Sequence, residues 1–402
     1  MMNTRKYFLI HVNIVMFLLG YWLMHSFLSV VTGDSSRTAS IVFNGIMLAL
    51  SIYIIAICRK DFGIERGKTL LTAFSITLIL YAVRMVMDVY VGPFSYILPD
   101  SEMWNDVVQI VGGVFFPTWA MIASRKYIDI NIVSRWIFWT GTVTCLFVLM
   151  DISIHGISFE EERVVAGRGL HSLALAKLGA IELMASVHIL INSNGVRRWI
   201  PVIGLVLGGF VALASGSRGS VVGVIVAISF YLIMAVRKYR VLMMMGVVVI
   251  IILAINIVAV LDWLEGFFPV FSYRMREAVI EGDNGGRNDY FQEAMQYIGE
   301  NPLLGYGYRL NADSTGYGPH NGILEIFLCF GVPLGLIFTF FIYIKSVVCS
   351  VLMMADKRFV FVSLMVIFSI VSSMSGSSIS TSTFDFSIAL LGIAYYYGFR
   401  RK

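Results

Sequence analysis

The chain has 402 residues, of which 58% are hydrophobic and only 14% are charged. Soluble globular proteins carry charge on roughly a quarter of their residues, so this composition excludes one large soluble core. The mean hydropathy of +0.81 is typical of a membrane protein. The net charge of +5 does not predict nucleic-acid binding, because a basic groove needs clustered surface Lys and Arg and most of this surface should face lipid.

Twelve stretches long enough to cross a bilayer follow one another along the chain. They are 7–31, 39–58, 68–88, 107–123, 134–151, 171–191, 199–215, 219–236, 241–261, 320–344, 359–374 and 384–399. The sequence therefore predicts an all-α polytopic integral membrane protein with about 12 transmembrane helices in a single membrane domain, residues 1–402. No small-residue cleavage site follows the first apolar run, so we expect its helix to be retained.

The distribution of Lys and Arg predicts the orientation. Numbering the loops alternately places 20 of the 30 basic residues at the two termini and in the even-numbered loops. Positive residues stay on the cytoplasmic side, so both termini are predicted to be cytoplasmic and the odd loops to face outward. A missed helix would have inverted this pattern downstream of it, which supports the count of twelve.

The basic residues predicted on the outer side are all arginine. They are Arg37, Arg163, Arg168, Arg218, Arg274, Arg276, Arg287 and Arg309. Planar, bidentate recognition of phosphate or carboxylate prefers Arg, whereas orientation and solubility accept Lys equally well. Arg outnumbers Lys in the whole chain, so chance is the alternative explanation. The outer side is net acidic, which makes its arginines local exceptions and candidates for binding an anion.

The largest outer loop spans 262–319 and contains a predicted short amphipathic helix. Apolar residues recur there with a 3.6-residue period from Tyr290 to Ile298, until Gly299 and Pro302 stop the pattern. We expect this helix to lie on the membrane or to cap the bundle. Arg287 stands at its N-terminus, where backbone N–H groups and the helix dipole favour an anion. The alternative is a solvated loop arginine.

Two further places depart from plain membrane packing. His320 and Asn321 stand where the loop re-enters the membrane, and Glu325 follows in the tenth span, placed to orient the imidazole. Imidazole suits proton removal near neutral pH, although a packed, hydrogen-bonded histidine is the alternative. The segment SGSRGS, 215–220, holds Arg218 in a tight outer hairpin whose Gly and Ser allow close backbone approach. An arginine snorkelling at a helix end is the alternative.

Charges within the predicted spans need a partner or a purpose. Arg84 and Asp88 are four residues apart, a spacing that lets them pair on one helix face. Lys177 and Glu182 are five apart and pair less well, so Lys177 could face a polar cavity. None of the four cysteines falls in an outer loop, and the sequence has no Cys/His zinc spacing.

Taken in order, three motifs resemble the family of O-antigen polymerases and O-antigen ligases. They are SRG at 217–219, Arg287 with the aromatic helix ending in NPLLGYGY, and HN at 320–321 followed by Leu324, Glu325 and Gly331. The resemblance covers roughly 205–345, and the first 200 residues are similar in hydropathy only. It implies a glycosyltransferase of the bacterial inner membrane whose active site faces the periplasm. It also implies a donor glycan linked through pyrophosphate to undecaprenol, with no metal, cofactor or nucleotide sugar.

The resemblance also implies roles for individual residues. His320 would be the base, and Arg218 and Arg287 would stabilise the departing pyrophosphate. Expected substrate-binding residues are Arg274, Arg276, Asn321, Glu325 and Arg309. One base without a carboxylate nucleophile favours a single displacement with inversion.

Within the family we expect a polymerase, which transfers the glycan to the non-reducing-end sugar of another lipid-linked repeat unit. A ligase, which attaches polymer to the lipid A core, is the alternative. A polysaccharide-repeat flippase or transporter is the alternative outside the family. Expected partners are the lipid-linked oligosaccharide, membrane lipid and a chain-length regulator protein, and no nucleic acid.

Overall fold

The computed structural model describes most of the chain, with gaps. The described residues are 4–32, 37–59, 109–155, 157–160, 163–166, 170, 172–193, 199–234, 255–282, 287–307 and 321–374, with isolated positions within 76–87, 248–252 and 385–396. Every structural statement below concerns these residues.

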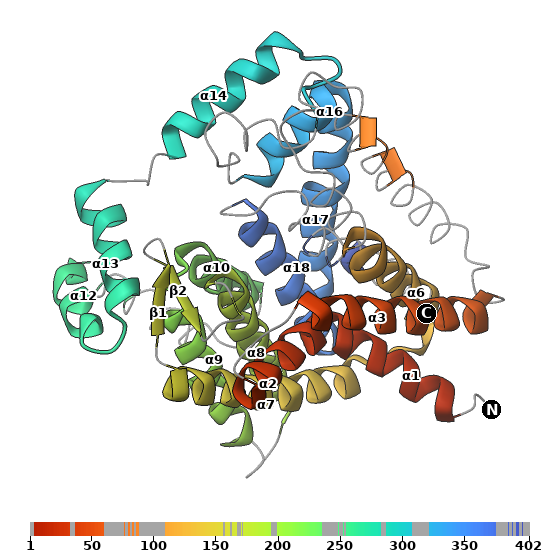
Figure 1. The fold of residues 1–402 in the computed structure, drawn as a ribbon, viewed down its shortest axis with the longest axis horizontal. Helices are drawn as coiled ribbons and strands as arrows, with labels where there is room; N and C mark the ends of the chain where they lie inside the picture. The colour runs from red at the N-terminus through yellow and green to blue at the C-terminus, as the bar shows by residue number, and fades with distance from the viewer. Residues whose placement is uncertain are drawn as a thin grey trace.

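Helices account for nearly all of the described structure (Figure 1). The first half contains α1 (Thr4–Val15), η1 (Met16–Gly20), α2 (Tyr21–Thr32), α3 (Arg37–Cys58), η3 (Gln109–Phe115), α6 (Phe116–Ser124), η4 (Arg125–Tyr127), α7 (Ile130–His155) and α8 (Ser172–Asn192). The second half contains α9 (Ile200–Ala214), α10 (Arg218–Met234), α12 (Ile257–Glu265), α13 (Pro269–Arg276), η6 (Glu277–Glu281), α14 (Arg287–Glu300), α16 (Gly322–Thr339), η7 (Phe340–Lys345), α17 (Ser346–Met353), η8 (Lys357–Phe359) and α18 (Val360–Ser373).

Five of these helical segments are long and apolar enough to cross a membrane. They are Arg5–Thr32, Ser40–Cys58, Ile130–Ile154, Ser172–Asn192 and Gly322–Met353, and α9 and α10 are shorter apolar helices. A helical membrane protein is therefore confirmed. The count of twelve spans stays a prediction, because the predicted spans 68–88, 241–261 and 384–399 lie mostly outside the described residues.

The distribution of polar and apolar side chains also fits a lipid environment. On α3, Ile46 and Tyr53 are 52% and 51% exposed, whereas Ser51 between them is fully buried. On α8, Glu182 and Ser186 are both buried. A protein surrounded by hydrocarbon is expected to turn its polar side chains inward and its apolar side chains outward. An unsatisfied polar group exposed to hydrocarbon costs on the order of several kcal/mol.

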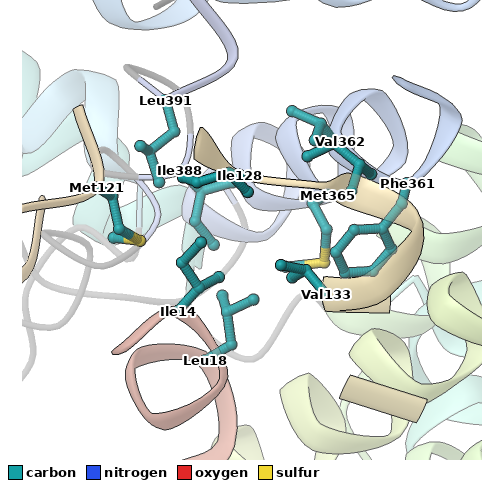
Figure 2. A pocket seen from close by; sticks show the side chains of 11 residues that line it. Ile14, Leu18, Met121, Ile128, Val133, Phe361, Val362, Met365, Ile388 and Leu391 are labelled. Carbon is teal, nitrogen blue, oxygen red and sulfur yellow. The ribbon is translucent and has the colours of Figure 1, made fainter. Parts of the chain in front are cut away.

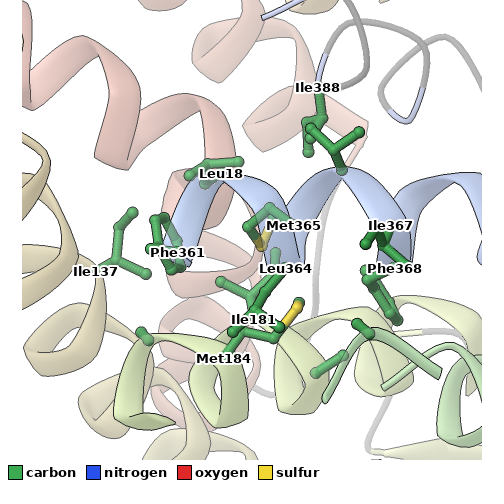
Figure 3. Close-up of a cluster of buried hydrophobic side chains, with 14 of the residues drawn as sticks. Leu18, Ile137, Ile181, Met184, Phe361, Leu364, Met365, Ile367, Phe368 and Ile388 are labelled. Atoms are coloured by element: carbon green, nitrogen blue, oxygen red, sulfur yellow. The ribbon is translucent and has the colours of Figure 1, made fainter. Parts of the chain in front are cut away.

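The core of the bundle forms where α18 packs against α8. Figure 3 shows Leu364 and Phe368 of α18 near Ile181 and Met184 of α8, with Leu18 on the opposite side of α18. The closest helix pair is α8 and α9, where a methyl group added at Gly179 would lie 2.5 Å from the carbonyl oxygen of Gly208. Small residues at such crossings let the two backbones approach closely, which is how helices associate within a bilayer.

One short hairpin accompanies the helices of the described residues. Strand β1 (Ile157–Glu160) pairs with strand β2 (Arg163–Ala166) as an antiparallel hairpin, with Ile157 opposite Ala166 and Glu160 opposite Arg163. The hairpin lies between α7 and α8. Alternation in ISFE and the β-branched pair in RVVA favour strands once a turn brings them together.

The predicted span 320–344 is helical, as part of the candidate span Gly322–Met353, and α16 is broken within it. Gly331 has φ of 73° and ψ of 177°, which lies outside helical geometry, and Pro333 follows two residues later. Proline lacks the N–H that would continue the helical hydrogen-bond ladder, and glycine alone adopts the required backbone without strain. The break divides α16 into two shorter helical pieces.

Candidate functional site

The turn between α9 and α10 holds the SGSRGS motif against α13. The backbone N–H of Ser217 donates to Ser215 Oγ at 3.1 Å, and Gly216 has a left-handed φ of 68°. A methyl group at Gly216 would lie 2.9 Å from Cγ1 of Val270 on α13. Only glycine combines this conformation with so close a contact, so the motif fixes where α10 begins relative to α13.

Arg218 and Arg274 bridge the turn and α13 in both directions. Arg218 Nη1 donates to the backbone carbonyl of Arg274 at 2.8 Å, and Arg274 Nη1 donates to the carbonyl of Gly216 at 3.4 Å. Both residues are half-buried. The described hydrogen-bond acceptor of Arg218 is thus a neutral carbonyl, which holds the guanidinium in place and leaves its positive charge to act on an anion.

Arg276, two residues further along α13, has different partners. Its Nη2 donates to Asp262 Oδ1 at 2.5 Å and lies 3.4 Å from Glu265 Oε2, both on α12. The hydrogen bond to Asp262 raises the pKa of this guanidinium. The sequence treated Arg274 and Arg276 alike, whereas the fold neutralises Arg276 with two carboxylates and places Arg274 beside Arg218.

The predicted amphipathic helix is confirmed as α14, which begins at Arg287 and ends at Glu300. Ala294 and Ile298 are buried against Leu328 of α16, whereas Met295 is exposed. Figure 1 shows α14 running from the side of α13 toward α16. The helix therefore caps the bundle through α16, and it carries Arg287 at its N-terminus.

The segment Asn301–Gly307 inserts into the break in α16. The backbone N–H of Tyr306 donates to the Leu328 carbonyl at 2.7 Å, and the N–H of Val332 donates to the Pro302 carbonyl at 2.7 Å. These bonds satisfy backbone groups that the break would otherwise leave without helical partners. The loop from α14 and the helix α16 are thus joined backbone to backbone.

Two glycines make this approach possible. A methyl group at Gly305 would lie 2.3 Å from the Leu328 carbonyl oxygen, and one at Gly331 would lie 2.4 Å from the Leu303 carbonyl oxygen. Both glycines have positive φ, 66° and 73°. Any side chain at either position would force the two backbones apart.

Side-chain hydrogen bonds to Glu300 also hold the segment Asn301–Gly307. Tyr306 Oη donates to Glu300 Oε2 at 2.8 Å, and Gln296 Nε2 donates to Glu300 Oε1 at 3.0 Å. The bonds from Gln296 and Tyr306 lower the pKa of the Glu300 carboxyl, and the bond to Glu300 raises the pKa of Tyr306. The ionised Glu300 therefore helps to hold the loop on the end of α14.

The N-terminus of α16 is capped by Asn321, the residue after His320 in the sequence. Asn321 Oδ1 accepts from the backbone N–H groups of Ile323 and Leu324 at 3.0 and 3.2 Å, which is a regular N-cap. Glu325 lies one turn into the helix and is half-buried. His320 and Arg309 lie outside the described residues, as do Arg84 and Asp88.

Lys177 has a partner that the sequence did not predict. Its Nζ lies 2.9 Å from Asp385 Oδ2, and the two side chains are 7% and 1% exposed. The neighbouring Glu182 accepts a hydrogen bond from Thr142 at 2.8 Å, so the two charges of this span have separate partners. The signal in the sequence was a lone acid at the start of an apolar stretch, 208 residues from the lysine.

The region that contains these motifs matches a known protein family. Residues 203–339 match the family model described as O-Antigen ligase. This region of the chain is therefore similar to the O-antigen ligase and polymerase family. The matched range agrees with the expected 205–345 and contains the SGSRGS turn, α13, α14 and the broken α16. No curated protein matches the chain.

Members of the O-antigen ligase and polymerase family are glycosyltransferase-like enzymes of the membrane. In this chain the family region places Arg218 beside Arg274, and it joins the helix of Arg287 to that of Asn321 and Glu325. The family match cannot separate a polymerase from a ligase.

An apolar cavity lies in a part of the chain outside the matched region (Figure 2). It is lined by side chains of α1, η1, α6, α7 and α18, among them Ile14, Leu18, Met121, Val133, Phe361 and Met365. Its lining offers no cation or hydrogen-bond donor from a side chain, so an anionic head group has nothing to bind there. The outer arginines remain the candidate site for an anion.

Proposed function

We propose that this chain is an O-antigen, or surface polysaccharide, polymerase. It transfers a glycan from undecaprenyl pyrophosphate to the non-reducing-end sugar of another lipid-linked repeat unit. One membrane domain, residues 1–402, carries the activity, and its large outer loop 262–319 faces the periplasm. The observation that carries the proposal is the family match over 203–339, which contains the paired Arg218 and Arg274 together with the broken helix α16.

The leaving group of this reaction is a dianionic pyrophosphate, and guanidinium groups suit it. Arg218 and Arg287 stabilise the negative charge that develops as the glycosidic bond breaks, and Arg274 supports Arg218 from α13. Preorganised donors contribute most in such a site because they need no rearrangement as the charge forms. Arg276 has a lesser role, since two carboxylates already balance its charge.

The acceptor hydroxyl must lose its proton as it attacks the anomeric carbon. His320 is the base, Glu325 orients it, and the reaction is a single displacement with inversion and no metal ion. Asn321 uses its carbonyl oxygen to cap α16, and its amide group remains the natural donor to a sugar hydroxyl. Arg309 adds a cation to the outer loop.

A ligase is the second candidate, because the matched family model carries that description. The two activities differ in their acceptor and therefore in the effect of deletion. Loss of chain-length ladders, with single repeats still attached to lipid A core, indicates a polymerase. Loss of all attached polymer, with lipid-linked chains accumulating, indicates a ligase.

The direct test uses purified protein and synthetic undecaprenyl-pyrophosphate repeat units in the presence of a chelator. Elongation is expected to continue, because arginines rather than a divalent metal stabilise the pyrophosphate. A requirement for Mg²⁺ would contradict the mechanism. If polymer still forms after substitution of Arg218, Arg287 and His320, a flippase or transporter becomes the better explanation.

A further inference from the structure

The hydroxyl group of Tyr343 lies directly against the first turn of α16. Tyr343 belongs to η7 and is 4% exposed. A methyl group added at Gly322, the first residue of α16, would lie 2.5 Å from Tyr343 Oη and 3.1 Å from the backbone carbonyl oxygen of Ser373. The first residue of α16 therefore packs closely against the Tyr343 hydroxyl and the C-terminal end of α18.

The same hydroxyl is tied to α18. Tyr343 Oη and Ser373 Oγ are hydrogen bonded at 3.2 Å, and Ser373 Oγ also donates to the carbonyl of Ile370 at 2.8 Å. Ser373 is fully buried. A buried hydroxyl with a fixed partner is a rigid contact, because releasing it leaves an unsatisfied polar group in an apolar interior.

A buried ion pair joins Lys177 of α8 to Asp385. Its two charged atoms are 2.9 Å apart. The carboxyl groups of Asp385 and Glu325 both act electrostatically on Tyr343. The Tyr343 hydroxyl thus contacts α16 at Gly322 and α18 at Ser373.

We propose that Tyr343 is a positioning residue for glycosyl transfer, which holds the first turn of α16, and with it Asn321, against α18. The proposal rests on the proposed function, because Asn321 and its neighbour in the sequence are there assigned to the acceptor and its proton. Tyr343 itself touches no reacting atom. A shift of about 1 Å at the start of α16 is enough to lower the rate by a factor on the order of 100.

The test removes the hydroxyl and keeps the ring, with Tyr343→Phe in the purified full-length protein. We expect kcat for elongation to fall by roughly tenfold or more, with the KM for the lipid-linked donor within about twofold of wild type. A change confined to kcat separates positioning from a loss of donor binding or of folded protein. Tyr231→Phe, at another buried tyrosine on α10, is the matched control and is expected to retain wild-type kcat.

A second pair of variants tests the contact itself. Gly322→Ala places a methyl group against the hydroxyl and is expected to lower kcat and the melting temperature. The double variant Gly322→Ala/Tyr343→Phe removes the clash, so its melting temperature is expected to recover relative to Gly322→Ala. Because the melting temperature does not depend on turnover, this comparison holds whatever the reaction is.

The outcomes separate this proposal from the function on which it rests. Wild-type elongation with undiminished kcat in Tyr343→Phe overturns the positioning role and leaves the polymerase assignment intact. An equal loss in the Tyr231→Phe control also overturns it, because any buried tyrosine would then have the same effect. Absence of elongation by the wild-type protein overturns the proposed function, and the positioning role with it.

Discussion

Among the described residues, two cationic centres differ in how their charge is balanced. At the outer centre, Arg218 and Arg274 donate to backbone carbonyls and are half-buried. At the inner centre, Lys177 meets Asp385 at 2.9 Å in a site closed to solvent. A carbonyl fixes the position of a guanidinium without neutralising it, whereas a carboxylate does both. Under the proposed function, Arg218 at the outer centre receives an anion, whereas the inner centre holds helices together.

Arg276 gives this comparison an internal reference. It lies two residues from Arg274 on the same helix, yet Asp262 and Glu265 bind it. Position in a predicted outer loop alone therefore does not make an arginine available to a ligand.

Breaking the inner centre on one side should have the largest effect. Lys177→Met leaves the Asp385 carboxylate buried without its partner, and we expect it to lower the free energy of unfolding by about 3–5 kcal/mol. Thermal unfolding of the purified protein in detergent measures this change. The double variant Lys177→Met/Asp385→Leu removes both charges and is expected to recover most of the loss. Equal destabilisation by the single and double variants would contradict a structural ion pair.

Removing the outer guanidinium should affect the reaction rather than the fold. Arg218→Ala is expected to lower the elongation rate by a factor of about 10²–10³, because one preorganised donor to the leaving group is lost. Arg218→Lys should recover little, since an ammonium group cannot reproduce the planar fork of donors. The matched control is Arg276→Ala, which is expected to retain activity near wild type. A similar loss of elongation rate in Arg218→Ala and Arg276→Ala would contradict the proposal that, of these two arginines, only Arg218 acts on the leaving group.

The joint between the outer loop and α16 is expected to tolerate no side chain. Gly331→Ala would strain a residue with φ of 73° and press a methyl group against the Leu303 carbonyl. We expect a loss of at least about 1–3 kcal/mol in unfolding free energy from the backbone strain alone. Gly299→Ala is the control, because its methyl group would meet nothing within 4 Å in α14. A helical alanine there should be neutral or stabilising by up to about 1 kcal/mol.

Acidification should loosen the same loop slightly. Hydrogen bonds from Gln296 and Tyr306 lower the pKa of Glu300 below its ordinary value of 4.5. A carboxyl group with a lowered pKa stabilises the fold above its unfolded pKa and loses that effect as the pH falls through the folded pKa. We therefore expect the melting temperature to drop below about pH 4.5 a little more in wild type than in Glu300→Gln. Identical acid profiles would show that the Tyr306–Glu300 bond contributes nothing measurable.

Much of the candidate site could be predicted because its signals are local. The period of apolar residues from Tyr290 to Ile298 and the stop at Gly299 gave α14 to within a residue or two. The tight SGSRGS turn predicted a hairpin that holds Arg218. The break at Gly331 was missed although its signal, a glycine two residues before a proline, was present. Hydropathy averages over such a break, so it reports one continuous span.

Partners far apart in the sequence could not be predicted in the same way. Nothing near Lys177 indicates Asp385, because the two residues are brought together only when α8 packs into the bundle. Arg274 and Arg276 have the same charge and almost the same position in the chain. Their separation into two roles follows from the rotation of about 100° per residue along a helix, which turns one toward Gly216 and the other toward α12.

The amino-acid sequence predicts a helical membrane protein, an unequal division of basic residues between the predicted loops, and the match of residues 203–339 to the family model. The first two properties follow from composition and local periodicity, and the third from local motifs, so none of them requires knowledge of contacts between distant segments. The tertiary structure alone decided which charges are balanced and where a helix is broken. Both depend on contacts between distant segments, since a buried charge or an open backbone group is stable only where another segment supplies its counterpart.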